Sequence, residues 1–591
     1  MRKISPRLLA LMMAGAVTVT SITPVTGYQT ITVNAATDSQ EKEAAQGYQT
    51  NLTGFDYKKG DWKETKDGLY SNAVDKGDCF AFSKTTAKNF VYSTDVTFKR
   101  NQGAATLIFR FNNNLDNKEC YAVNIDGGSH KCKLWRWQEN SDYQLIDEKE
   151  VKATDDEKYT LKVVAYDSWI SYYVNDTLVA STGDYTLQKD DKGQSTVLTE
   201  GSLGLLNWNG EMTFQNTYYT ELNDQNTPEL KNISVSSSTG DVEKAAQFTS
   251  TEPIMIQYVK NNAETVDLNI EKKNKNADVQ VEYDGKIYND GKNIPVKVGK
   301  NYITVKSTVQ GENGQTATLT YRVNVHRRAA DKTYYNEAYR NQYHYSVKDG
   351  WGNDLNGLVK YKGTYHMFYQ FYDDTKWGPM HWAHATSKDL IHWEEQPIAL
   401  YPDANGAMFS GCIVADEKNT SGLFGDGNEG GLVALITADG NGQRIKVAYS
   451  TDEGKTWKKT NKIAADWSKD PLNNRDFRDP KVFRWENKWF MVIAGGPLRI
   501  YSSDNLTDWK CESTYADLHT ECPDLYPIET KDGVKWVLSR GGRFYKVGDF
   551  KQVDGKWKFV ADEAYKNSDG VMNFGKDSYA AMTYYVQDFG T

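Results

Sequence analysis

Apolar and polar residues alternate over short runs along most of the chain, and turn-forming residues separate these runs. Residues 91–98, 301–306 and 318–325 are clear examples. An alternation with a period of two places the apolar side chains on one face of a β-strand, so the pattern predicts an all-β protein. Polar segments at residues 223–228 and 327–332 are suited to linkers and divide the predicted strands into three regions.

A local pattern recurs after three apolar strands in the C-terminal region. Each copy begins with serine and ends with tryptophan, and successive tryptophans lie 64 and 52 residues apart. A repeat of about 50 residues is typical of the four-stranded blades of a β-propeller. The middle copy also resembles an Asp-box, whose aspartate we expect to cap its own turn. The copies are residues 387–393, 450–457 and 503–509.

Length and charge narrow the class of protein. The 591 residues are enough for three or four domains, and the formal charge is −9. Residues 1–35 have the pattern of a signal peptide, with three cations ahead of an apolar run at residues 8–19. Removing this segment takes the formal charge to −12, because it holds no acidic residue. That charge argues against nucleic acids and other polyanions as partners.

The predicted location is outside the cell, without insertion into the membrane. Beyond the signal peptide, no stretch approaches the run of about 20 apolar residues that a membrane-spanning helix needs. Any attachment to the cell surface would use a segment that this chain does not contain. We expect the secreted protein to be a monomer.

Six cysteines are too few for a disulfide scaffold in a chain of this length. Their spacing matches no metal site, and we predict no metal and no other cofactor. Cysteine usually behaves as a small buried apolar residue, which favours free thiols. A disulfide between Cys120 and Cys132, on predicted neighbouring strands, is the alternative. Cys522 is expected to pack beneath its own loop.

Three short acidic motifs in the C-terminal half centre on Asp354, Asp479 and Glu521. Two carboxylates that flank a sugar bond are the minimum for glycoside hydrolysis, since one attacks or activates water and the other protonates the leaving oxygen. Asp354 and Glu521 can fill these two roles. Each motif taken alone is also a common kind of loop turn. The prediction of a hydrolase site therefore rests on the order of the motifs and on the segments around them.

The three motifs occur together with further segments, and the whole set resembles glycoside hydrolase family 32, the levanases, inulinases and invertases. The resemblance implies a five-bladed β-propeller catalytic domain, here at residues 335–591, followed by a β-sandwich. Only 249 residues run from Tyr343 to Thr591, so we expect the propeller to be truncated within its fifth blade. The segments are residues 343–346, 351–370, 377–385, 409–411, 477–480, 521–523 and 577–581.

The resemblance also implies roles for individual residues in a retaining mechanism. Asp354 would be the nucleophile, Glu521 the acid and then the base, and Asp479 the acceptor of hydrogen bonds from ring hydroxyls. Retention requires the two carboxyl groups to lie about 5–5.5 Å apart. We expect the nearby charges of Asp354 and Asp479 to keep Glu521 protonated near neutral pH. The residues expected to shape the single-sugar pocket are Asn353, Gln370, Trp377, Phe409, Ser410 and Arg478.

Two positions depart from the family pattern. Leu355 stands where that family usually has proline, and Ala383 stands where glycine is usual. Proline fixes its own backbone and restricts the residue before it, so Leu355 is expected to loosen a turn at residues 353–357 that presents Asp354. Neither change removes a catalytic group.

Two further domains are predicted ahead of the propeller. Residues 48–222 resemble the fructan-binding modules of carbohydrate-binding family 66, which are lectin-like β-sandwiches. Arg110, Asp126 and Arg136 are the candidates for sugar contacts, with ion pairs at the strand surface as the alternative. Residues 227–327 are predicted to form a small Ig-like or cadherin-like sandwich that acts as a spacer.

These expectations combine into a secreted β-fructosidase that binds fructan polysaccharides or oligosaccharides. It would release fructose from levan, inulin or sucrose through a covalent fructosyl-enzyme. A fructosyltransferase of the same fold is one alternative, because transfer differs only in the acceptor that meets this intermediate. A non-catalytic fructan-binding surface protein is the other. The choice between β-2,6 and β-2,1 linkages depends on the rim of the pocket.

Overall fold

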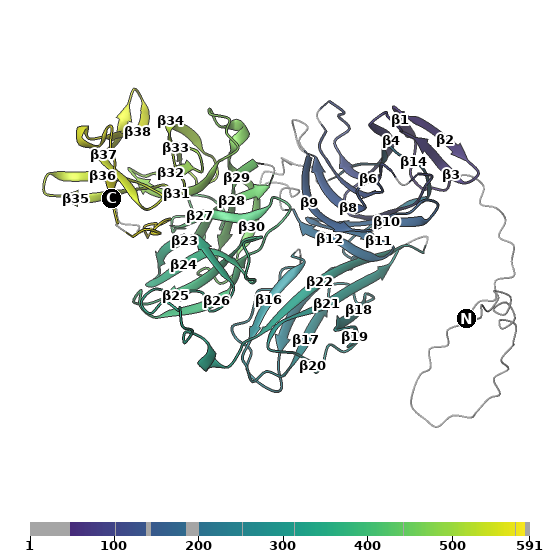
Figure 1. Ribbon diagram of the computed structural model, residues 1–591, viewed down its shortest axis with the longest axis horizontal. Coiled ribbons are helices and arrows are strands. Elements are labelled where there is room, and N and C mark those ends of the chain that lie inside the picture. The colour runs from purple at the N-terminus through teal and green to yellow at the C-terminus, as the bar shows by residue number, and fades with distance from the viewer. Residues whose placement is uncertain are drawn as a thin grey trace, which may run out of the picture. The chain divides into compact units, whose positions relative to one another are not determined.

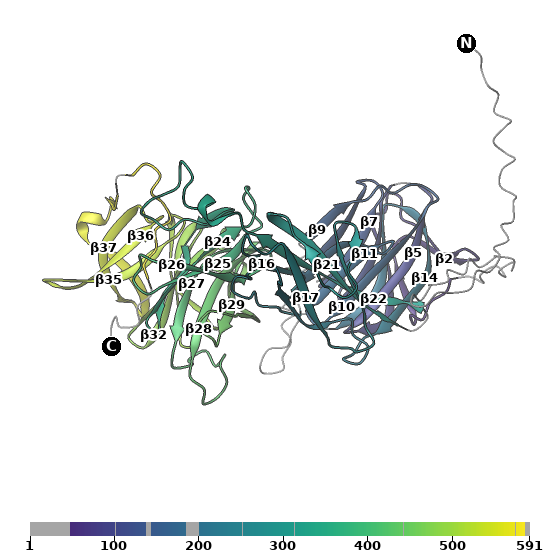
Figure 2. The ribbon, with the colours of Figure 1, turned by 90° about the horizontal axis from the view of Figure 1, so that it is seen from below.

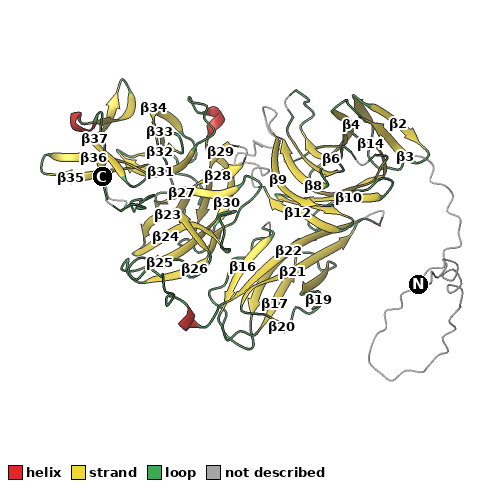
Figure 3. Ribbon diagram, in the orientation of Figure 1, coloured by secondary structure: helices red, strands yellow, loops and turns green. Residues whose placement is uncertain are grey.

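The computed structural model describes residues 48–584, apart from residues 101, 117, 138–142, 185–199, 251, 312–313, 441 and 574. All of them belong to one compact unit. The predicted signal peptide lies outside the described residues. In the described part, the helices are three short 3-10 turns, and strands and loops make up the rest (Figure 3). The prediction of an all-β protein is confirmed. None of the helices described could cross a membrane. The turns are η3 (Asp331–Thr333), η4 (Trp467–Lys469) and η5 (Glu563–Tyr565).

The first domain is a lectin-like sandwich of two seven-stranded sheets (Figure 1). Side chains from both sheets form one apolar core between them. The first sheet runs in the order β1 (Phe55–Lys58), β4 (Asp78–Ala87), β13 (Gly201–Trp208), β6 (Ala104–Phe111), β7 (Cys120–Asp126), β8 (Lys131–Trp137), β9 (Tyr143–Glu150). The second runs in the order β12 (Thr177–Gly183), β11 (Trp169–Val174), β10 (Lys158–Tyr166), β5 (Phe90–Phe98), β14 (Glu211–Glu221), β3 (Gly68–Asn72), β2 (Asp61–Thr65).

Strand β5 shows why both faces of the second sheet are buried. Tyr92 points into the core between the two sheets. Val91, on the opposite face, belongs to a second core that continues into the next domain. In that core the rings of Trp169 and Tyr321 lie 4.7 Å apart. The two sandwiches are therefore joined by an apolar interface.

The second domain is a smaller sandwich, and this part of the fold prediction is also confirmed. Its strand β16 is parallel to β22, and the remaining pairs are antiparallel. One sheet consists of β15 (Leu230–Ser236), β17 (Thr265–Lys272) and β20 (Ile294–Pro295). The other runs in the order β16 (Ile254–Val259), β22 (Thr316–Arg327), β21 (Gly299–Gln310), β18 (Asp278–Tyr283), β19 (Lys286–Ile287).

The segment predicted to be a polar linker after this domain is instead packed at Arg328. This side chain is 1% exposed and pairs with Glu395 at 2.7 Å and with Asp349 at 3.3 Å. Its guanidinium also lies 3.8 Å from the ring centre of Tyr258. A charge buried at this depth needs such partners to offset its lost hydration. The junction with the third domain is therefore fixed by specific contacts.

The third domain contains four successive four-stranded antiparallel units among the described residues (Figures 1 and 2). The first strand of each unit packs against the first strand of the next. This is the arrangement of propeller blades. The units are β23 (Trp351–Tyr361), β24 (Thr364–Tyr372), β25 (His381–Ser387), β26 (Trp393–Leu400); β27 (Ala407–Asp416), β28 (Gly431–Gly440), β29 (Gly442–Ser450), β30 (Lys458–Asp466); β31 (Arg478–Trp485), β32 (Lys488–Ala494), β33 (Pro497–Ser503), β34 (Lys510–His519); and β35 (Asp524–Thr530), β36 (Gly533–Arg540), β37 (Phe544–Val553), β38 (Lys556–Ala561), with β39 (Gly570–Val571) paired to β37.

The recurring Ser-to-Trp pattern forms the turn between the third and fourth strands of the first three units. In every copy the indole N–H donates to the carbonyl three residues earlier, at 2.8–3.2 Å. The residue with that carbonyl has a positive φ of 63–79° in all three. In the middle copy the Asp452 carboxylate accepts from the Thr456 backbone N–H at 2.9 Å, as expected of a self-capping turn. The carbonyl residues are Leu390, Gly454 and Leu506.

All six cysteines are free, and five of them are buried. Cys120 and Cys132 do lie on neighbouring strands, but Cys120 is opposite Trp137 and Cys132 is opposite Ile125. This register separates the two thiols along the strands. The alternative of a disulfide between them is therefore wrong.

Candidate active site

The propeller units bring the three acidic motifs together through their first strands. Asp354 is the fourth residue of β23, Ser410 the fourth of β27 and Asp479 the second of β31. Glu521 lies in the loop just ahead of β35. Because each first strand packs against the next, equivalent positions near their starts converge on one place.

The predicted turn at residues 353–357 is wrong. These residues belong to β23, but the pairing with β24 shifts register on both sides of Leu355. Such bulges leave residues unpaired and re-aim their side chains. Leu355 pairs with Tyr369 and packs against an apolar core of the first unit. An irregular strand, anchored at this leucine, presents Asp354.

A chain of hydrogen bonds joins four of the predicted site residues. Asn353 Nδ2 donates to Gln370 Oε1 at 3.0 Å, and Gln370 Nε2 donates to Ser410 Oγ at 2.8 Å. Ser410 Oγ then donates to Asp354 Oδ2 at 3.1 Å. Burial raises the pKa of Asp354, and the bond from Ser410 acts in the opposite direction. The chain fixes the carboxylate and favours its charged form.

Asp479 and Cys522 form the deepest part of the site. Both have positive φ, 58° and 43°, which is uncommon for residues other than glycine and is typical of functional sites. This backbone directs the Cys522 N–H to Asp479 Oδ2 at 2.9 Å. Burial raises the pKa of Asp479 to about 6. The site thus holds a buried carboxylate that gains its proton at mildly acidic pH.

The Cys522 thiol lies 3.7 Å from Oδ2 of Asp354 and 3.7 Å from Oδ2 of Asp479. Burial, followed by the two carboxylates, raises the pKa of this thiol. The protonated sulfur can therefore act as a weak donor between two acids that would otherwise repel each other. Its role extends beyond the packing that the sequence predicted.

Glu521 is held by cationic and phenolic donors. Arg478 Nη2 donates to Oε1 at 2.6 Å and Tyr579 Oη donates to Oε2 at 2.9 Å. The hydrogen bond from Arg478 lowers the pKa of Glu521. The expectation that neighbouring acids keep this residue protonated is wrong for this geometry, because the directly bound cation outweighs them. The side chain is 47% exposed, so it lies at the mouth of the site.

An aromatic pair forms one wall of the site. The rings of Trp377 and Phe409 meet edge to face at 5.6 Å. The indole N–H of Trp382 donates to the Phe409 carbonyl at 2.9 Å. Two residues after Phe409, at Gly411, an added Cβ atom would lie 2.1 Å from the Leu435 carbonyl oxygen. Only glycine fits there, and this close approach positions Phe409 and Ser410.

Sequence reasoning missed the roles of Tyr579 and Gln443. Tyr579 belongs to a segment that carried the family resemblance, so that segment was its signal. Gln443 Oε1 accepts from Arg478 Nη1 at 3.1 Å and from the backbone N–H of Phe477 at 2.9 Å. No motif surrounds Gln443, and only the fold places it beside the Arg-Asp-Pro segment.

In the lectin-like sandwich, Arg110 and Arg136 both lie near the carboxylate of Asp184, whereas Asp126 lies elsewhere. Arg110 is fully buried, and its Nη2 donates to the carbonyls of Lys88 and Asp167, each at 2.9 Å. Burial lowers the pKa of Arg110 to about 10. Arg136 is 7% exposed and pairs with Asp184 at 3.1 Å. Neither arginine forms the predicted alternative, an ion pair at the strand surface.

Asp126 lies at the opposite end of β7 from Tyr121, the partner of Arg136. At about 3.3 Å per residue, five residues separate these positions by about 16 Å. Its Oδ1 accepts from the backbone N–H groups of Gly128 and Ser129, each at 3.0 Å. Asp126 therefore caps the hairpin between β7 and β8. Within the described residues, no cluster of three or more His, Cys, Asp or Glu side chains is suited to a metal ion.

Three family models match the chain. Residues 344–589 match the glycosyl hydrolases family 32 N-terminal domain. Residues 47–219 match the 3-keto-alpha-glucoside-1,2-lyase-like domain. Residues 230–328 match the cadherin-like beta sandwich domain, as predicted for the second region.

Individual proteins match as well. The chain is 68% identical over 534 residues to a fructan beta-fructosidase of Streptococcus mutans, covering 90% of this chain and 38% of that protein. It is 42% identical over 285 residues to a levanase of Bacillus subtilis, covering 43% of this chain and 40% of that protein. A solved carbohydrate-binding module CBM66 from Bacillus subtilis is 27% identical, with a TM-score of 0.26, covering 29% of this chain and 98% of the module. The chain spans about two fifths of the curated relatives.

Proposed function

We propose, from the premise that residues 344–589 carry the N-terminal domain of glycosyl hydrolase family 32, that this chain hydrolyses β-fructosidic bonds in fructans with retention of configuration. The observation that carries the proposal is the convergence of Asp354, Asp479 and Glu521. These residues come from three separate strand starts, and Cys522 links two of them. Paired carboxylates at a site with an exposed mouth are the equipment that this reaction needs.

In the first step, Asp354 attacks the anomeric carbon of the terminal fructosyl unit. The bond to the leaving oxygen breaks, and that oxygen takes a proton from Glu521. A covalent fructosyl-Asp354 ester remains. Asp479 accepts hydrogen bonds from ring hydroxyls, and these strengthen as positive charge develops on the ring. Ser410 supports the attacking carboxylate through the hydrogen bond at 3.1 Å.

In the second step, Glu521 removes a proton from water, and the water oxygen attacks the anomeric carbon. The bond from this carbon to Asp354 breaks, which frees the carboxylate and releases fructose. Arg478 and Tyr579 favour the charged form of Glu521, which suits this half of the reaction. For the first half, Glu521 must carry a proton. We propose that the bound substrate weakens the hold of Arg478, because the leaving oxygen competes for the same carboxylate.

Around these groups, Asn353, Gln370, Trp377 and Phe409 form the single-sugar pocket. Fructofuranose offers hydroxyl groups and an apolar face, and such ligands are bound by a few planar polar groups beside aromatic rings. Amide and hydroxyl donors are joined here in one hydrogen-bonded chain. The match of these side chains to a small neutral sugar supports an exo-acting enzyme on levan or inulin.

The preceding domains extend this function. We propose that residues 48–222 bind fructan and that residues 227–327 hold this module at a fixed position relative to residues 335–591. The apolar interface at Trp169 and the ion pairs of Arg328 support a rigid spacer. A polysaccharide substrate cannot enter a cell intact, so we further propose that the protein is secreted and acts as a monomer.

Incubation with levan followed by product analysis tests the activity. The expected product is free fructose, with the anomeric configuration retained when the reaction is followed by NMR. Longer or rearranged oligosaccharides would identify a fructosyltransferase instead. Unchanged levan would indicate a fructan-binding protein without catalysis. The matched control is Asp354→Asn, which keeps the size of the side chain and removes the nucleophile.

A further inference from the structure

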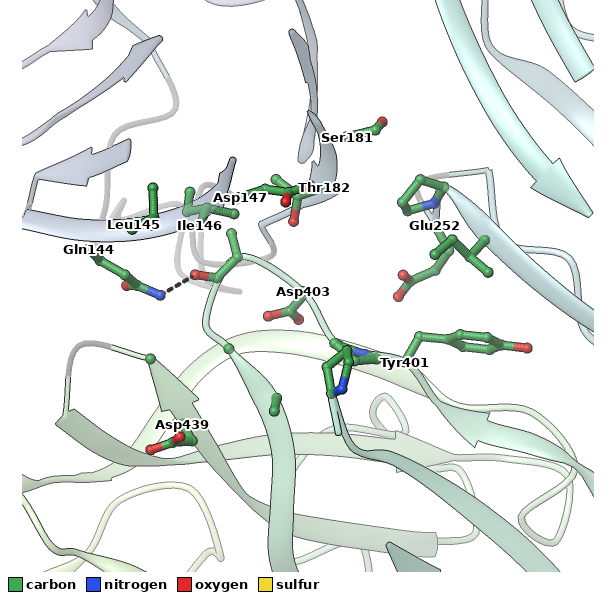
Figure 4. Close-up of a pocket in the computed structure, with 18 of the residues that line it drawn as sticks. Gln144, Leu145, Ile146, Asp147, Ser181, Thr182, Glu252, Tyr401, Asp403 and Asp439 are labelled. Carbon is green, nitrogen blue, oxygen red and sulfur yellow. Dashed lines mark hydrogen bonds between the residues drawn. The ribbon is translucent and has the colours of Figure 1, made fainter. Parts of the chain in front are cut away.

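A cavity of about 550 Å³ lies where the three domains meet (Figure 4). The lectin-like sandwich contributes β9 and β12, the second domain contributes residues 252–254, and the propeller contributes residues 401–407 and the end of β28. Its volume falls in the range of about 300–1,000 Å³ that is typical of ligand sites. None of the roles proposed above uses this cavity.

The lectin-like sandwich forms one wall by direct hydrogen bonds to the propeller. Gln144 Nε2 donates to the Ala404 carbonyl at 2.9 Å (Figure 4). The Ala404 N–H in turn donates to the Gly183 carbonyl at 2.8 Å. Beneath this contact lies Gly440, where a Cβ atom would come within 2.5 Å of Gln144 Nε2. The sandwich is therefore docked on the loop that leads into β27, the strand that carries Phe409 and Ser410.

The cavity reaches the two segments that carry the aromatic pair. Ala407 and Pro379 line it, and each lies two residues from a member of the aromatic pair, Phe409 and Trp377. On the propeller wall, Asp439 Oδ1 accepts from Gln443 Nε2 at 3.2 Å.

Gln443 in turn binds Arg478, and Arg478 binds Glu521. One hydrogen-bonded chain therefore runs from the cavity wall to the residue that protonates the leaving oxygen. Because Glu521 is the proposed proton donor to the leaving oxygen, this chain connects the cavity wall to the group that acts on the leaving side.

The charges of the walls select a class of ligand. Lys459 pairs with Glu252 at 2.7 Å and with Asp403 at 3.4 Å, which offsets these two acids. In the part of the chain that the structure describes, no lysine or arginine lies within ion-pair distance of Asp147 or Asp439. These carboxylates, on the sandwich and propeller walls, can accept hydrogen bonds from hydroxyl groups and repel anions. A neutral polyhydroxylated ligand fits them.

We infer that this cavity binds the fructan chain on the leaving side of the cleaved bond, and that the lectin-like sandwich supplies one wall of that subsite. The inference rests on the proposed function, because only a fructan hydrolase has a leaving chain. It gives the docked sandwich a role in choosing long fructans over sucrose. Sucrose has a single glucose unit on the leaving side and makes fewer contacts there.

Two variants of the full chain test the two walls separately. In Asp147→Ala and in Asp439→Asn, the KM for a levan oligosaccharide should rise about 10- to 150-fold, the loss expected for a hydrogen bond to a charged group. The KM for sucrose should change less than the KM for the oligosaccharide in both variants. In Asp147→Ala, kcat should stay the same for both substrates, whereas Asp439→Asn is judged on the two KM values, because Asp439 also contacts Gln443. Asp56→Ala is the control, since Asp56 is exposed on β1, at the opposite edge of the sheet that contains β9.

The outcomes separate the possibilities. An effect of Asp147→Ala without an effect of Asp439→Asn would mean that the sandwich has its own sugar site away from the propeller, and it would overturn the inference. Equal increases of KM for sucrose and oligosaccharide would also overturn it, because the cavity would then act on the catalytic centre alone. Unchanged KM values in both variants would overturn it as well, since neither wall would then contact the leaving chain.

A binding measurement distinguishes failure of this inference from failure of the proposed function. If the unmodified protein releases no fructose from sucrose or levan, the proposed function fails. Calorimetry with the levan oligosaccharide, in a Glu521→Gln background, still probes the cavity. Weaker binding of the oligosaccharide in both wall variants would support the cavity as a fructan site. If neither variant changes this binding, the inference is rejected.

Discussion

The propeller and the lectin-like sandwich contrast in how their candidate residues are arranged. In the propeller, Asp354, Asp479 and Glu521 are far apart in sequence and meet in one site. In the sandwich, Arg110 and Asp126 are close in sequence, yet one is buried beneath carbonyl groups and the other caps a hairpin. Polar residue type alone therefore does not identify a sugar site. Position on a repeated architecture brings distant residues together, because each propeller unit presents the start of its first strand to the same place.

The largest effect is expected from Asp354→Ala in the propeller site. Loss of the nucleophile should lower kcat/KM on levan by about 10⁴-fold or more. The protein should remain folded, because the carboxylate is partly buried with a raised pKa and its removal relieves an unfavourable charge. Fructose release and thermal unfolding measure the two results. Asp504→Ala, at an exposed surface pair, is the control, and comparable activity in both variants would remove Asp354 from the mechanism.

Glu521→Ala should lower kcat/KM less than Asp354→Ala does, and the size of the loss should depend on the substrate. On levan we expect a loss of about 10²- to 10⁴-fold, since the leaving oxygen loses its proton donor. A substrate with a good leaving group needs little protonation, so its first step should be partly spared. Burst kinetics with such a substrate separate the two steps. A uniform loss on both substrates would contradict the role of Glu521 as the acid.

In the sandwich, Arg110→Ala should change stability. The substitution leaves a cavity in place of a fully buried side chain and removes the donor to the carbonyl groups of Lys88 and Asp167. Together these losses should lower the free energy of unfolding by roughly 3 kcal/mol. Chemical denaturation measures this loss. Arg100→Ala is the matched control, because its pair with Glu211 is long and exposed. Unchanged stability together with lost fructan binding would instead make Arg110 a ligand contact.

The pH profile should respond to Arg478→Gln. In the proposed mechanism Glu521 is protonated in the first step, so kcat/KM is expected to fall as pH rises through its pKa. Arg478 lowers that pKa and thereby moves this alkaline limb to lower pH. Without the cation, the limb should move to higher pH, although kcat/KM at its maximum should fall. A limb that keeps its position would show that another group controls it.

The smallest effect is expected from Asp126→Ala. Burial raises the pKa of this residue, but hydrogen bonds from Ser129 and Lys133 outweigh it and lower the pKa overall. The turn should lose about 1 kcal/mol, and affinity for fructan should stay the same. Ser129→Ala, which removes one partner of the same turn, should cost less. A clear loss of fructan binding in Asp126→Ala would restore it as a sugar contact and weaken the contrast between the two domains.

The sequence by itself determined the fold class, the family resemblance and the Ser-to-Trp turns. These features depend on local periodicity and short-range hydrogen bonds, such as the indole bond to a carbonyl three residues away. The resemblance of the C-terminal region to glycoside hydrolase family 32 is confirmed by the match of residues 344–589 to the N-terminal domain of that family.

Only the tertiary structure decided the electrostatics and the contacts between distant residues. The lowered pKa of Glu521 depends on Arg478, 43 residues away, and on Tyr579, 58 residues away. The bulged strand that presents Asp354 depends on its pairing with β24, and the cavity beside it depends on Gln144 reaching Ala404 across 260 residues. Charge interactions and packing act through space. A linear pattern does not encode which distant side chain will supply the nearest charge.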